Sequence, residues 1–97
     1  MRWLTCTTNE KRITNRVNEQ IKVINHIALF GDFYILIKEE PPLSNENNYN
    51  WISISVNGEW CTSGHQTIES AKDHAMLIVK GKIEHILEQI MEIENEH

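Results

Sequence analysis

The Asn57-Gly58 pair constrains the fold of this chain more than any other short feature. Before it, residues 51–56 alternate between apolar and small polar side chains, and residues 59–62 form a second short run after it. Asn-Gly between two such runs is the strongest short-range signal for a two-residue β-hairpin, because both turn positions need a positive φ. A type I′ turn predicts that Val56 pairs with Glu59, Ser55 with Trp60 and Ile54 with Cys61.

This register divides the predicted hairpin into two faces, because successive side chains of a strand point to opposite sides. The predicted core face carries Ile52, Ile54, Val56 and Cys61. The opposite face carries Trp51, Ser53, Ser55, Trp60 and Thr62. Two tryptophans beside small hydroxyl groups would be an unusual apolar patch on a solvated face. We therefore expect this face either to be covered or to bind a ligand.

A further strand is predicted before the hairpin. Residues 33–37 are a run of β-branched, aromatic and aliphatic side chains that Pro41-Pro42 ends. The polar residues 43–50 are expected to form an exposed, mobile loop.

After the hairpin, the chain from Gln66 onward predicts one long helix with Thr67 as its N-cap. Gly81 falls on the polar side, so the apolar stripe continues past it, although helix continuity at Gly81 stays open. A continuous helix over 67–94 is about 40 Å long, more than a domain of this size needs. The surplus predicts a partner helix along a seam at three- and four-residue spacing. The seam residues are Met76, Val79, Ile83, Ile86, Ile90 and Ile93.

The N-terminal third fits two interpretations. Thr7 and Glu10 have the spacing of a capping box, and apolar residues from Ile13 to Ala28 recur at helical spacing, which predicts a helix ending near Gly31. Residues 21–29 also fit a strand that turns at Gly31-Asp32. We favour the helix. The predicted fold is α+β (α-β-β-β-α), a single domain over residues 1–97: an N-terminal helix, a three-stranded antiparallel meander and a long C-terminal helix.

Composition and charge narrow the function. The 97 residues hold fourteen acidic and nine basic side chains, and the net charge of −5 argues against a nucleic-acid partner, because it repels a phosphate backbone. No apolar run is long enough for a signal peptide or a membrane span, so we expect a soluble, cytoplasmic protein. Cys6 and Cys61 are expected to be free thiols.

Residue patterns for catalysis or metal binding are absent from the sequence. There is no Gly-rich phosphate loop, paired-cysteine zinc motif or HExxH, so we expect no enzyme, no metal and no cofactor. His74 and His85 are too far apart to share an ion, and Cys61 and His65 are interpreted as structural. The carboxylates Glu84, Glu88 and Glu92 form an acidic surface that could dock a basic protein.

Two families resemble parts of the chain. Residues 33–87 resemble the HicB-type antitoxin domain, with Thr67, Glu69 and Ala71 matching the start of that family's helix. This resemblance implies an oligomeric protein that neutralises a small RNA-cleaving toxin. The expected α-β-β-β-α order, with Gly64, residues 70–72 and Ala75, more faintly resembles double-stranded-RNA-binding domains.

Together these observations predict a small acidic, non-enzymatic protein-interaction module. We expect a homodimer paired through the long helix or the tryptophan face, with a basic protein as a further partner. One alternative is a protein that binds a small apolar or aromatic ligand at Trp51 and Trp60. The other is a nucleic-acid-binding variant of the double-stranded-RNA-binding type of fold.

Overall fold

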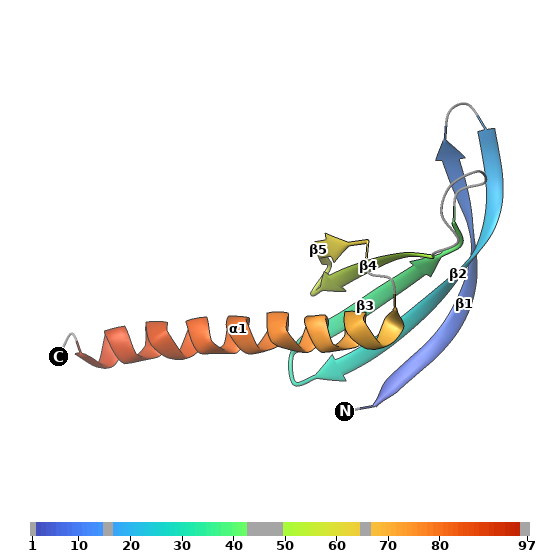
Figure 1. Ribbon diagram of the computed structural model, residues 1–97. Coiled ribbons are helices and arrows are strands. Elements are labelled where there is room, and N and C mark those ends of the chain that lie inside the picture. Colours follow the sequence, from blue (N-terminus) through green and yellow to red (C-terminus); the bar gives the residue numbers. More distant parts are fainter. Residues whose placement is uncertain (1, 15–16, 43–49, 65–66, 96–97) are drawn as a thin grey trace.

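The computed structural model describes residues 2–14, 17–42, 50–64 and 67–95 (Figure 1). Within these ranges, five antiparallel strands form one sheet in chain order, and a single helix follows them. The strands are β1 (Trp3–Thr14), β2 (Val17–Phe30), β3 (Phe33–Glu40), β4 (Trp51–Val56) and β5 (Glu59–Ser63), and the helix is α1 (Ile68–Asn95). The protein is therefore α+β, with the helix on one face of a five-stranded meander.

The predicted N-terminal helix is wrong, and so is the three-stranded sheet. Residues 3–30 form the long hairpin β1–β2, with a register that runs from Trp3 opposite Ala28 to Thr14 opposite Val17. The residues that suggested helical spacing are divided between two strands and two faces: Ile13 lies on β1, Ile24 and Ala28 of β2 face α1, and Ile21 of β2 points away from it. An interior strand carries apolar side chains on both faces, so its sequence need not alternate.

The predicted hairpin is confirmed at its turn. Asn57 and Gly58 have φ values of 53° and 83°, as a type I′ turn requires. Two hydrogen bonds tie the turn to β3: the Asn57 backbone N–H donates to the Tyr34 carbonyl (2.8 Å), and the Tyr34 N–H donates to Asn57 Oδ1 (2.7 Å).

The hairpin register is confirmed in part. Val56 pairs with Glu59 and Ser55 with Trp60, as predicted. A bulge then shifts the register, so that Ile54 pairs with Thr62 and not with Cys61. Thr62 therefore points to the same side as Ile54, and Cys61 is exposed and not in the core.

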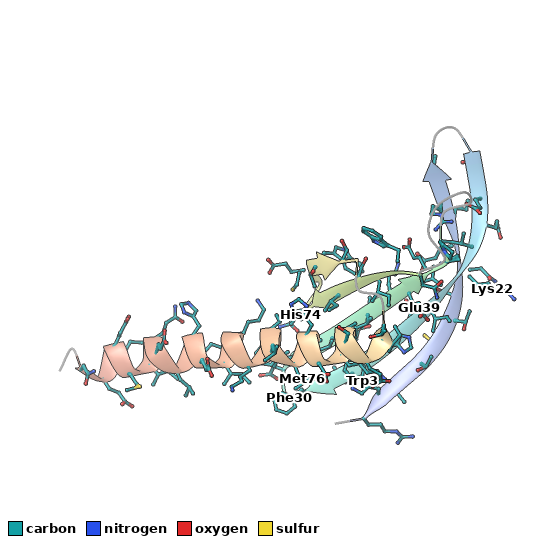
Figure 2. All side chains as sticks on the ribbon, viewed as in Figure 1. Trp3, Lys22, Phe30, Glu39, His74 and Met76 are labelled. Carbon is teal, nitrogen blue, oxygen red and sulfur yellow. The ribbon has the colours of Figure 1, made fainter. Side chains whose placement is uncertain are left out.

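Helix α1 is continuous through Gly81, and its predicted N-cap is confirmed, because the Ser70 N–H donates to Thr67 Oγ1 at 3.1 Å. Ala71, Ala75 and Val79 are buried against β3 and β4, where two small alanines let the helix lie close to the sheet. Trp3 and Met76 pack at the margin of this core (Figure 2). The core residues of the strands are Ala28, Ile35, Ile37, Ile52, Ile54 and Val56.

The second half of α1 projects beyond the sheet, as its predicted length implied (Figure 1). The molecule measures 60 × 28 × 20 Å, and its radius of gyration is 17.0 Å. A compact domain of this length has a radius of gyration of about 13 Å. The C-terminal part of α1 therefore lies outside the packed core, which stabilises the sheet and the first half of the helix.

Candidate interaction surfaces

The overhang, defined as residues 84–95 of α1, is the part of the helix that is not buried against any described strand. Every side chain in it is exposed, including large apolar ones such as Ile90 at 46% and Met91 at 60%. Its apolar side chains continue the stripe that begins with Ala71, Ala75 and Val79 in the core. A helix of this length is marginally stable by itself in water. A contiguous exposed apolar surface is typical of an interaction site.

The structure divides the predicted helix seam into two parts. Val79 is buried in the core of its own chain, and Met76 and Ile83 are half-buried against that core. Only the last three residues of the seam lie free: Ile86, Ile90 and Ile93. Leu87 and Met91 are exposed beside them, and the spacing argument missed both.

Charges are distributed unequally along α1. The basic side chains Lys72, Lys80 and Lys82 all precede the overhang. The predicted acidic surface, Glu84, Glu88 and Glu92, is exposed along the overhang and continues to Glu94. The helix is therefore basic toward its middle and acidic toward its C-terminal end.

The sheet face opposite α1 carries an apolar row that crosses all five strands. Paired positions place Leu4, Ile27, Leu36, Ser55 and Trp60 in one line. No described helix covers this face, and Leu4 is 57% exposed. Leu29 and Tyr34 form an exposed neighbouring pair. The row could not be predicted while β1 and β2 were interpreted as a helix.

The predicted tryptophan site is an open hollow of about 350 Å³ at the β4–β5 edge of the sheet. Four of its five predicted residues line it: Trp51, Ser53, Trp60 and Thr62. Ser55 does not, because it is buried in the apolar row between Leu36 and Trp60. The bulge adds Cys61 and Ser63 to the lining.

Both indoles of this hollow are about half exposed, at 54% each. The Trp51 ring lies over the backbone of Gly64, where an added Cβ would be 3.9 Å from the ring. The Gly64 N–H donates to the Ile52 carbonyl at 2.7 Å, which fixes the end of β5 beside β4. The hollow therefore offers two aromatic walls and several hydroxyl groups to a small ligand.

Two of the cations on the strands, Lys38 and Arg12, are engaged by neighbours. Lys38 Nζ donates to Glu10 Oε1 at 2.8 Å across β2, and this bond lowers the pKa of the Glu10 carboxyl. Arg12 donates to Glu19 Oε2 (3.1 Å) and to the Pro41 carbonyl (2.8 Å). These pairs neutralise two of the charges that a phosphate backbone would need. The α-β-β-β-α order that suggested a likeness to double-stranded-RNA-binding domains is not the order of the described elements.

His26 is a buried titratable group beneath the start of α1. Its Nδ1 lies 3.4 Å from Thr5 Oγ1, and its Nε2 lies 3.9 Å from Glu39 Oε1. Burial lowers the pKa of His26, and Lys72 lowers it further, whereas Glu39 acts in the opposite direction. Within the described ranges no three His, Cys, Asp or Glu side chains are grouped to hold a metal ion. The predicted Cys61–His65 proximity involves His65, which lies outside those ranges, as does most of the predicted loop over 43–50.

Comparison with protein-family models, with curated proteins and with solved structures gives no match to this chain. Among the described residues, no helix combines the length and the apolar composition needed to cross a membrane. The described residues offer three surfaces for binding: the overhang, the apolar row and the tryptophan hollow.

Proposed function

We propose that this chain is a small non-enzymatic protein-interaction module that acts as a homodimer through α1. The observation that carries the proposal is the overhang, whose exposed apolar side chains continue the buried stripe of the helix. Removing such side chains from water contributes about 25 cal/mol per Å² of apolar area, and the entropy cost of association is subtracted from this gain. A second protein surface would also order a helical end that is marginal alone.

A basic protein is the proposed further partner. The exposed carboxylates Glu84, Glu88 and Glu92 give the C-terminal end of α1 a negative field that attracts such a protein. The resemblance to the HicB-type antitoxin domain supports the same class of partner, because antitoxins of that type neutralise a small toxin by binding it.

Analytical ultracentrifugation tests the homodimer. We expect the protein to be dimeric at tens of micromolar and the Ile90→Lys variant to be monomeric, because a lysine replaces an apolar side chain in the seam. Leu77→Lys is the matched control: it changes a still more exposed apolar residue (67% against 46% for Ile90) that lies on another side of α1, and it should leave the dimer intact. A wild-type chain that stays monomeric at several hundred micromolar would overturn the proposal.

The tryptophan hollow supports a second candidate function, the binding of a small aromatic ligand. Its two half-exposed indoles and its hydroxyl groups fit a ring with a polar substituent. Titration with p-cresol, followed by NMR of the indole N–H signals, tests this function. We expect the Trp51 and Trp60 signals to shift and that of Trp3, on the other side of the sheet, to stay in place. Equal shifts of all three signals, or none, would contradict a specific site.

A further inference from the structure

The charge pattern of α1 points to one occupant for the overhang: we infer that a second copy of this chain lies on it in antiparallel orientation. This inference deepens the homodimer proposed above and depends on it. It follows from the spacing of the apolar seam, the room that the sheet leaves, and the distribution of charge along the helix.

The seam residues fit an antiparallel pair. A two-fold axis close to Glu88 places Ile83 opposite Ile93 of the second copy, and Ile86 opposite its Ile90. Both contacts then occur twice, as an isologous interface requires. The four seam residues follow one another at the three- and four-residue spacing at which paired helices interlock.

The sheet limits how far the second helix can extend. Val79 is covered by its own sheet, whereas from Glu84 onward the helix is exposed. In the register above, Asn95 of the second copy reaches Gly81. The paired segment therefore fills the exposed length of the seam and ends where the sheet begins.

Charge selects the antiparallel orientation. Lys80 and Lys82 stand just before the overhang, and Glu92 and Glu94 stand at its far end. An antiparallel pair brings the basic segment of each copy beside the acidic end of the other. A parallel pair would instead gather the carboxylates of both copies at one end, where like charges repel.

Lys80 and Glu94 make the closest match of opposite charges. They are separated by about four helical turns, so they project from the same side of α1. In an antiparallel pair related by a two-fold axis, the same sides of the two helices face one another. Lys80 then lies within about one turn of Glu94 of the second copy, and the symmetry makes this pair twice.

Cysteine cross-linking tests the orientation. The exposed thiols are first removed with Cys6→Ser and Cys61→Ser, and single Lys80→Cys and Glu94→Cys chains are then mixed and oxidised. We expect the 80–94 disulfide to form in excess over the 94–94 disulfide. Predominant 94–94 linkage would show a parallel pair and overturn the inference.

Charge reversal gives an independent readout that does not depend on oxidation. We expect Lys80→Glu and Glu94→Lys each to weaken dimerisation about tenfold, and the double variant to restore it. If the wild-type chain is a dimer but neither reversal changes its affinity, the inference fails while the homodimer stands. If the wild-type chain is a monomer, both proposals fail.

Discussion

At the residue scale, two glycines of this chain serve opposite purposes. Gly58 has a φ of +83° in the hairpin turn, where an L side chain is strained although an added Cβ would meet no atom within 4 Å. Gly81 lies inside α1 and also has open space around its Cα. We expect Gly58→Ala to lower the free energy of unfolding by about 1 kcal/mol and Gly81→Ala to raise it by about 0.5–1 kcal/mol. Urea denaturation of both variants checks this, and effects of the same sign would contradict it.

A pH dependence of stability follows from His26. Burial under α1, aided by the Lys72 charge, lowers the pKa of His26, so the folded protein binds its proton less readily than the unfolded chain does. The contribution to stability is therefore full above the unfolded pKa of about 6.5 and is lost as the pH falls below that value.

Unfolding free energies measured between pH 8 and pH 5 test this dependence. We expect the decline toward pH 5 to be smaller in His26→Gln than in the wild type. The exposed His85 provides the matched control, since His85→Gln should keep the wild-type decline. A His26→Gln profile parallel to that of the wild type would rule out the assignment.

The grouping of Trp51, Ser53 and Trp60 was predictable from the sequence because it depends on a turn and on alternation, which are both local. The bulge turns Thr62 to the side of Ile54, away from Ser53 and Trp60, yet Thr62 still borders the hollow from the edge strand β5. Alternation alone does not predict a bulge. Cys61 was assigned to the core and lies exposed on the hollow for the same reason.

At the scale of elements, α1 packs on the sheet through small side chains. Ala75 is fully buried, so a larger side chain there has to push the helix away from β3 and β4. We expect Ala75→Leu to lower the free energy of unfolding by about 1–3 kcal/mol. The exposed Leu77 is the comparison, because Leu77→Ala should change stability by less than about 0.5 kcal/mol. Thermal unfolding of the two variants decides whether the helix is seated as described.

The elements that the sequence predicted correctly are those with signals of their own: the Asn57-Gly58 turn, the run that Pro41 ends, and the Thr67 cap. The long hairpin β1–β2 has one such signal among the residues described, the Gly31-Asp32 turn that ends β2, and the helix interpretation assigned it to a helix end. Strand β2 lies between two strands, and its apolar side chains point both toward α1 and away from it. The spacing of these side chains matched a helix by coincidence. Pairing with β1 and β3 makes the segment a strand.

At the scale of the whole molecule, the core and the overhang are separable. The core lies between the sheet and the first half of α1, whereas the overhang touches neither. We expect a chain ended after Glu84 to keep its cooperative unfolding and to lose the dependence of its melting temperature on protein concentration. The full-length chain, measured over a hundredfold range of concentration, is the control. A shortened chain whose melting temperature still rises with concentration would place the contact elsewhere, and the apolar row on the open sheet face would be the first surface to test.

The free end of α1 has a consequence for how long the protein survives in a cell. In the proposed pair the helix beyond Glu84 would be shielded from proteases, whereas in a lone chain it is exposed along its whole length and would be the first part of α1 to open. Degradation would then fall on newly made or surplus single chains and spare those that have found a second copy. The amount of the protein would therefore influence its own lifetime, and dilution alone would be enough to start its removal.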